Sequence, residues 1–169
     1  TFVVSYVVLT LLYSFVFKKV AFVDAVCLAA LFSLRIPIGV AALGVPISPW
    51  LLTFSGMFFL SLGLAKRHLE VMKTSKEAGY TASGRGYQSE DWPVTLAFGV
   101  ASAISAIIIM MLFIQDETQV AAKYASPDWL YVIAACLLLW LMRIWQFAHR
   151  SHLDDDPIVF PLKDRTSLC

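Results

Sequence analysis

Basic residues gather in two short segments of the sequence, each beside a tyrosine or a carboxylate. The candidates are Tyr13, Lys18, Lys19, Lys66, Arg67 and Glu70. Ammonium and guanidinium groups donate charge-assisted hydrogen bonds to anionic oxygens, so this set predicts a site for a phosphate or a diphosphate. Lys66 and Glu70 also have the i, i+4 spacing of an ion pair on one helix face. The alternative is that these cations mark only the inner side of a membrane protein and bind lipid headgroups.

A cation flanked by glycines, in residues 83–87, is a further candidate. Arg85 lies between Gly84 and Gly86, and Tyr87 follows. Glycines leave the backbone free to adopt many conformations, so this segment could close over an anionic substrate as a lid. An ordinary connecting loop is the competing interpretation.

Arg35 is a charged residue within a long apolar stretch. An unpaired charge near the middle of a bilayer costs at least ~2.5 kcal/mol, so such a residue usually faces a polar cavity or a partner. Asp24 lies eleven residues earlier. That separation is three helical turns plus about 20°, which puts both residues on one face roughly 16 Å apart. With Pro37 expected to bend the helix, we interpret Asp24 and Arg35 as lining a substrate cavity. An ion pair that holds helices together is the alternative.

The remaining polar groups give no recognisable metal or disulfide pattern. His149, His152 and the aspartates at 154–156 lack the spacing of metal ligands and are interpreted as a solvated surface. The three cysteines include no C-x-x-C pair. Neither a disulfide framework nor a zinc site is therefore indicated.

The elements that position these residues are predicted to be membrane-spanning helices. Hydrophobic residues make up 59% of the chain, charged residues 15%, and the mean hydropathy is +0.74. A run of about 18 apolar residues can cross the bilayer as a helix, and helices satisfy their own backbone hydrogen bonds there. The chain is therefore predicted to be all-α, a polytopic transmembrane bundle of about five spans. These are residues 1–17, 20–43, 49–65, 92–114 and 129–147.

Aromatic residues near the ends of these segments match an interfacial belt. They are Trp92, Trp129, Tyr131 and Trp145. Trp92 followed by Pro93 is also expected to begin the fourth helix, because proline fits the first turn.

The distribution of Lys and Arg predicts an orientation in the membrane. Eleven of the thirteen fall on one predicted side, while Lys123 falls on the other and Arg35 within a span. The eleven are Lys18, Lys19, Lys66, Arg67, Lys73, Lys76, Arg85, Arg143, Arg150, Lys163 and Arg165. We expect a bacterial inner-membrane protein with these basic loops and the C-terminus in the cytoplasm.

We divide the chain into a helical bundle, residues 1–150, and a short polar cytoplasmic tail, residues 151–169. Residues 69–91 are predicted to form a long inner loop. The net charge of +1 and the absence of a basic stripe give no case for nucleic-acid binding. No basic segment precedes the first apolar run, so this run is not a signal peptide, and we expect further sequence upstream of Thr1.

The order of several segments resembles the UbiA prenyltransferase superfamily, closest to the branch of decaprenyl-phosphate phosphoribosyltransferase. The matching segments are residues 13–19, Asp24, Leu34-Arg35, Gly39, residues 46–50, the Lys66-Arg67-x-x-Glu70 motif, residues 84–87 and residues 156–165. The resemblance covers nearly the whole chain. It implies the C-terminal part of a bundle of about nine helices, with a central cavity that holds a polyprenyl chain.

The resemblance also implies how the site is built. Phosphate or diphosphate groups would be held by basic residues and Mg²⁺ at the cytoplasmic mouth of the cavity. Lys66, Arg67 and Glu70 stand where typical members have a second aspartate motif. The first motif, Asn-Asp-x-x-Asp, is absent from this chain and is expected upstream with the main magnesium ligands. We therefore expect this chain alone to be inactive.

Two reactions fit the resemblance. In the first, phosphoribose passes from phosphoribosyl diphosphate to a polyprenyl phosphate. In the second, a prenyl group passes from its diphosphate to an aromatic acceptor. Two hypotheses from other classes remain: an anion or lipid transporter in which Arg35 binds the substrate, and a membrane subunit without catalysis.

Overall fold

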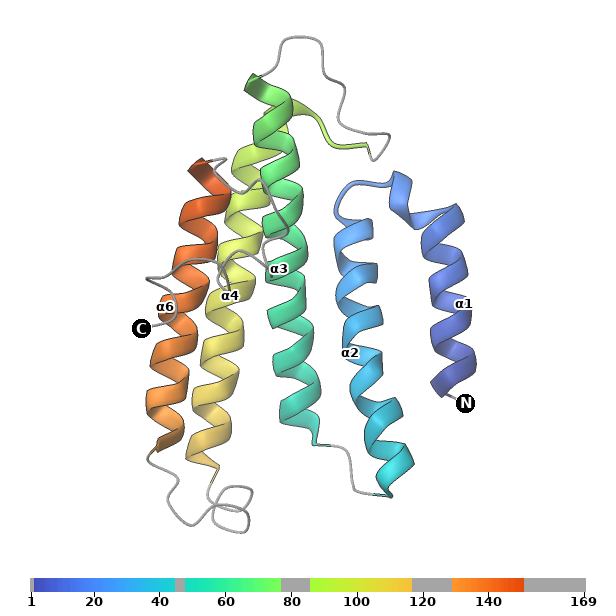
Figure 1. The fold of residues 1–169 in the computed structure, drawn as a ribbon, viewed down its shortest axis with the longest axis vertical. Coiled ribbons are helices and arrows are strands. Elements are labelled where there is room, and N and C mark those ends of the chain that lie inside the picture. Colours follow the sequence, from blue (N-terminus) through green and yellow to red (C-terminus); the bar gives the residue numbers. More distant parts are fainter. Residues whose placement is uncertain (1, 45–47, 77–85, 117–128, 151–169) are drawn as a thin grey trace.

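The computed structural model describes residues 2–44, 48–76, 86–116 and 129–150, and this part of the chain is all-helical. It contains five α-helices, which lie roughly along one axis (Figure 1), and two short 3₁₀ turns. They are α1 (Phe2–Phe15), η1 (Phe17–Lys19), α2 (Val23–Leu43), α3 (Pro49–Lys76), η2 (Ser89–Asp91), α4 (Trp92–Gln115) and α6 (Trp129–Arg150). The predicted fold class is confirmed. The predicted tail, residues 151–169, lies outside the described residues.

Among the described residues, four helices are long and apolar enough to cross a membrane. These spans are Val23–Ala41, Pro49–Lys73, Ser89–Gln115 and Trp129–Arg150. Helix α1 has only 14 residues, and at 1.5 Å per residue it is about 21 Å long, shorter than the hydrocarbon core. The described part of the expected fifth span is thus helical over Phe2–Phe15.

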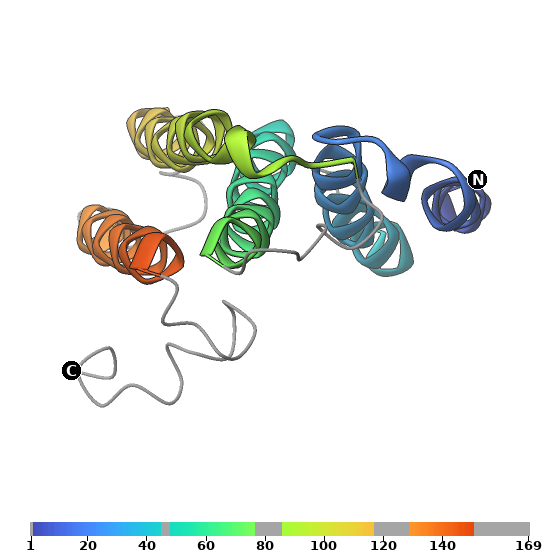
Figure 2. The same ribbon diagram turned by 90° about the horizontal axis from the view of Figure 1, so that it is seen from above.

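Helix α3 lies at the centre of the arrangement (Figure 2). It contacts α2 on one side and α4 and α6 on the other, while α1 contacts α2 at the periphery. Consecutive helices run in opposite directions (Figure 1). The start of α2 and the end of α3 therefore lie at the same end of the bundle, which we call the Arg67 end.

The helix boundaries agree with the sequence except at the end of α3. Helix α4 begins at Trp92 with Pro93 in its first turn, as predicted. Helix α3, however, continues eleven residues beyond Ala65, to Lys76, so the predicted loop from residue 69 is wrong in its first third. The loss of hydrophobicity after Ala65 ends the apolar run but not the helix, because residues 66–76 contain no glycine or proline and many good helix formers.

The contact between α3, α4 and α6 is centred on a buried tryptophan. Trp145 is 6% exposed; its Nε1–H donates to Ser61 Oγ at 3.0 Å, and Ser61 Oγ donates to the carbonyl of Gly99 at 2.9 Å. A Cβ atom at Gly99 would lie 2.0 Å from the Trp145 ring. The assignment of Trp145 to an aromatic belt is therefore wrong. Its indole enters the core because Gly99 leaves space and Ser61 satisfies the N–H.

Candidate functional site

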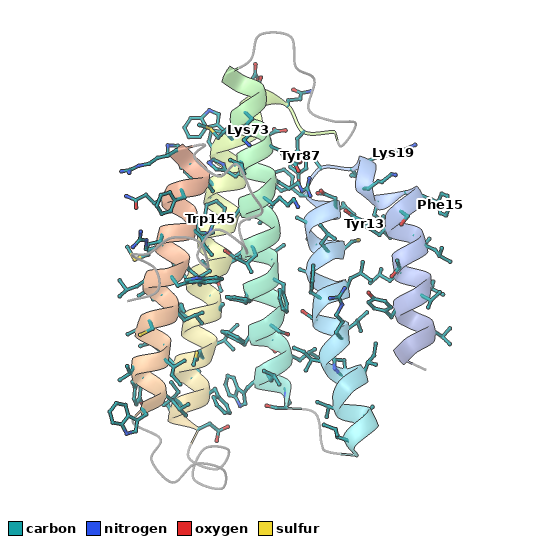
Figure 3. The ribbon with its side chains drawn as sticks, viewed as in Figure 1. Tyr13, Phe15, Lys19, Lys73, Tyr87 and Trp145 are labelled. Atoms are coloured by element: carbon teal, nitrogen blue, oxygen red, sulfur yellow. The ribbon has the colours of Figure 1, made fainter. Side chains whose placement is uncertain are left out.

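Polar residues from distant segments meet at the Arg67 end of the bundle. Tyr87 lies between the upper parts of α2 and α3, and Tyr13 and Lys19 lie beside the neighbouring turn that joins α1 to α2 (Figure 3). They meet because α1 and α3 both end at this end of the bundle, and α2 and α4 both begin there (Figure 1). The site thus combines the start of α2, the end of α3 and the segment that precedes α4.

A buried ion pair joins α2 to α3. Asp24 is 0% exposed and Arg67 is 2% exposed, and Asp24 Oδ2 lies 3.1 Å from Arg67 Nε. These two atoms lack the alignment of a hydrogen bond, so their contact is mainly electrostatic. The guanidinium also pairs with the Glu70 carboxylate through NH1. Arg67 thereby has carboxylate partners on two sides within this chain.

The hydroxyl of Tyr87 completes the environment of Asp24. It donates to Asp24 Oδ1 at 2.7 Å and accepts the backbone N–H of Phe22 at 2.8 Å. Phe22 is the residue before α2 and has a positive φ of 65°, a conformation that non-glycine residues rarely adopt. The Phe22 and Tyr87 rings also meet edge to face, with centroids 5.5 Å apart. Burial and the hydrogen bond to Asp24 raise the pKa of Tyr87, so the phenol remains a neutral donor.

Gly86 brings this segment against the turn that carries the first two lysines. Its φ is +73°, and a Cβ atom there would lie 2.7 Å from the carbonyl oxygen of Lys19. Glycine is therefore required at this approach. We call Gly86 and Tyr87 the strap, because they contact the α1–α2 turn through Lys19, Phe22 and Asp24.

The structure brings some of the predicted site residues together and separates others. Tyr13 is half-buried and lies within electrostatic range of Asp24, Arg67 and Glu70. Lys18 and Lys19 are exposed on η1, and Lys66 is half-buried on α3. Arg85 lies outside the described residues.

Arg35 lies apart from the Asp24–Arg67 pair. Its side chain is exposed, donates to the Tyr6 hydroxyl at 3.3 Å and lies over the Phe32 ring at 4.6 Å. Asp24 instead faces α3. Asp24 and Arg35 therefore do not share one polar face: Asp24 contacts α3, whereas Arg35 contacts α1. The ion pair of Asp24 is with Arg67 and not with Arg35.

A second buried polar group was not predicted from the sequence. His68 is 0% exposed. The hydroxyl of Thr95 donates to the carbonyl of Trp92 at 3.0 Å and so offers its lone pairs to His68 Nδ1, also at 3.0 Å. With Nδ1 protonated, His68 Nε2 accepts from Nδ1 of the exposed His149 at 3.3 Å. The sequence feature that could have predicted the burial of His68 is its position seven residues, or two helical turns, after Ser61. This spacing places both residues on the α3 face toward α4 and α6.

The described residues do not fit a magnesium site. Among residues 2–44, 48–76, 86–116 and 129–150, no three His, Cys, Asp or Glu side chains are grouped as metal ligands. The buried carboxylate of Asp24 already forms an ion pair with Arg67 and accepts a hydrogen bond from Tyr87.

Comparison with known proteins gives a family and two relatives. The sequence profile of the UbiA prenyltransferase family matches residues 1–163. The uncharacterized protein y4nM of Sinorhizobium fredii is 51% identical over 162 residues, which are 96% of this chain and 31% of that protein. The nodulation protein NoeC of Azorhizobium caulinodans is 28% identical over 166 residues, 97% of this chain and 53% of that protein. The chain therefore spans about a third of the length of the first curated relative and about half of the length of the second, and no solved structure matches it.

Proposed function

The chain belongs to the UbiA prenyltransferase family, and from that premise we propose that it forms part of a membrane transferase acting on a polyprenyl phosphate or diphosphate. The Arg67 end would hold the phosphate groups and face the cytoplasm of a bacterial inner membrane. The observation that carries this proposal is the buried Asp24–Arg67–Tyr87 contact. It fixes the turn bearing Lys18 and Lys19 against the end of α3, where Lys66 lies.

The cations at this end divide into two roles. Lys18 and Lys19 are exposed and Lys66 is half-buried, so their ammonium groups are the proposed ligands of phosphate oxygens. Arg67 is buried between Asp24 and Glu70. We assign it a positioning role, since its charge is already balanced by carboxylates and its burial keeps it from an approaching anion.

The proposed reaction transfers phosphoribose from phosphoribosyl diphosphate to a polyprenyl phosphate. An oxygen of the lipid phosphate forms a bond to the anomeric carbon of the ribose. The bond between that carbon and the diphosphate oxygen breaks, and its electron pair leaves with the diphosphate. Preorganised cations beside the leaving group stabilise the charge that develops there. Magnesium bound outside the described residues would supply further positive charge.

Prenyl transfer to an aromatic acceptor is the second candidate, and the family description itself favours it. In that reaction the diphosphate leaves the lipid instead of the sugar. The same lysines would bind the departing group. The two candidates therefore share a phosphate site and differ in the second substrate.

The test uses the complete protein that carries this chain, reconstituted in lipid vesicles. One arm supplies labelled phosphoribosyl diphosphate with polyprenyl phosphate, and the other supplies polyprenyl diphosphate with a panel of aromatic acceptors. Product in the first arm alone supports phosphoribosyl transfer, and product in the second arm alone supports prenyl transfer. Absence of product in both arms would refute the proposed function.

Variants then locate the phosphate site. Lys66→Ala should reduce transfer about 10- to 100-fold, the loss expected for a charge-assisted contact. Lys73→Ala, two turns further along α3 and exposed, is the matched control and should retain near-normal transfer. Equal activity of both variants and the unchanged protein would remove Lys66 from the site.

A further inference from the structure

An apolar cavity of about 360 Å³ lies at the end of the bundle opposite Arg67. It is bordered by the start of α3, the end of α4 and the start of α6, which meet at the lower end of Figure 1. Its lining residues are Ser48, Trp50, Leu51, Phe54, Ile109, Met110, Phe113, Ile133 and Leu137. The volume falls within the range of about 300–1,000 Å³ that is usual for ligand pockets.

The lining positions follow helical spacing on all three helices. Trp50, Leu51 and Phe54 repeat as i, i+1 and i+4 on α3, as do Ile109, Met110 and Phe113 on α4. Each helix therefore presents one continuous face to the cavity. The cavity is a feature of how the three helices pack rather than a gap beside a single side chain.

A row of stacked aromatic rings continues from the cavity lining toward the middle of the bundle. Phe54 stacks on Phe58, with centroids 5.7 Å apart, and Phe58 stacks on Trp140 at 5.9 Å. Phe58 lies one turn beyond Phe54 on α3, and Trp140 lies about one turn beyond Leu137 on α6. These rings join α3 to α6 beside the cavity.

The polar edge of Trp50 is satisfied at the end of the cavity near the helix termini. Its Nε1–H donates to Asp116 Oδ2 at 3.1 Å. The rest of the indole remains apolar and borders the cavity. A polar ligand would leave most of its groups unpaired against this lining, whereas a hydrocarbon chain loses nothing there.

The cavity and the Arg67 contact lie on different faces of α3. Phe54 and Arg67 are thirteen residues apart, which corresponds to about 220° around the helix and about 20 Å along it. Arg67 faces α2, while Phe54 faces α4 and α6. A lipid whose phosphate is held near Arg67 would have to pass through the packed α3–α4–α6 core to reach the cavity.

We propose that this cavity binds one acyl chain of a bilayer phospholipid that is separate from the substrate lipid. The helices that border it span the membrane, so hydrocarbon is the medium around it. Its position on the α4–α6 face of α3, away from Arg67, separates it from the proposed site for the substrate phosphate. This inference rests on the membrane location and the packing, and it does not depend on the reaction that the protein catalyses.

The test measures which lipid remains bound after purification in mild detergent. The complete protein is purified, exposed to vesicles of phosphatidylethanolamine and phosphatidylglycerol with added polyprenyl phosphate, and examined by native mass spectrometry. Ile109→Trp fills the cavity. Ile108→Trp, on the adjacent and 51% exposed position of α4, is the control. We expect one phospholipid on the unchanged protein and on Ile108→Trp, and at least a tenfold lower occupancy on Ile109→Trp.

Three outcomes would overturn the proposal: no retained lipid, equal phospholipid on both variants, or polyprenyl phosphate as the molecule that Ile109→Trp displaces. If Ile109→Trp fails to fold, Leu137→Phe fills less of the cavity, with Leu138→Phe at the neighbouring exposed position as its control. Transfer activity is a separate measurement, so failure of the proposed reaction leaves this result interpretable.

Discussion

Helix α3 makes buried polar contacts on two sides, one between charged groups and the other between neutral groups. Toward α2, Arg67 and Asp24 place full charges inside the protein. Toward α4 and α6, Ser61, Trp145 and His68 use only neutral hydrogen bonds. Burying charge is costly unless it is well paired, while neutral polar groups need only their hydrogen-bond partners. The α3–α4–α6 side is thus a neutral core, and the charged α2–α3 side is the one to which we assign the proposed phosphate site.

Removal of Arg67 should have the largest effect. Arg67→Met leaves the Asp24 carboxylate buried without its cation, which costs about 3–5 kcal/mol in comparable cases. We expect a loss of that size in the free energy of unfolding, measured by detergent-induced unfolding in mixed micelles. Arg143→Met, a half-buried arginine on α6 that lies against the Phe147 ring, is the control and should lose much less. If both variants lost a similar free energy of unfolding, the Asp24–Arg67 ion pair would contribute no more to stability than the Arg143 contact does.

A larger residue at Gly99 tests the close packing of Trp145 in the α3–α4–α6 core. Gly99→Ala places a Cβ atom against the Trp145 ring, and overpacking of this kind costs about 1–3 kcal/mol or more. Gly39→Ala is the matched control, since nothing lies within 4 Å of a Cβ atom there. The same unfolding assay should separate the two variants. If Gly99→Ala were as stable as Gly39→Ala, the close packing of Trp145 on α4 would be wrong.

Removal of the strap hydroxyl gives a smaller effect. Tyr87→Phe keeps the ring but leaves Asp24 Oδ1 and the Phe22 N–H without this partner, at a cost of about 1–3 kcal/mol. Because the lysine turn would be held less firmly, we expect KM for the phosphorylated substrate to rise more than kcat falls. Tyr131→Phe, an exposed tyrosine at the opposite end, should change neither constant. A fall in kcat alone would argue against a positioning role for the strap.

The pH dependence of Tyr87 is the smallest expected effect. Its pKa is raised in the folded protein, so its contribution to stability is complete below the unfolded value of about 10 and is lost as pH rises toward the folded value. Burial also raises the pKa of Tyr13, so the test uses Tyr13→Phe as its background, in which phenolate absorbance should show a late ionisation step from Tyr87. The late step should be missing in Tyr87→Phe. Its persistence in that variant would assign the step to another residue.

The sequence predicted the helical elements better than their contacts. The start of α4 followed from Trp92-Pro93, and α6 begins at Trp129, where the fifth span was predicted to begin. The partner of Asp24 did not follow, because face geometry within α2 pointed to Arg35 while the ion pair depends on the antiparallel return of α3. Trp145 was misplaced for a similar reason, since its burial depends on Gly99 of another helix. Periodicity describes one helix at a time, and these contacts depend on two or three.

The most direct test of the account is the double variant Asp24→Asn with Arg67→Met. If the α2–α3 contact is a buried ion pair, removing both charges leaves no uncompensated charge, and the double variant should recover at least half of the stability that Arg67→Met alone loses. Its transfer activity should stay low, because the end of α3 and the lysine turn would no longer be held together by charge. If the double variant lost as much free energy of unfolding as the two single variants lose in total, Asp24 and Arg67 would act independently. The ion pair could then not be what organises the Arg67 end.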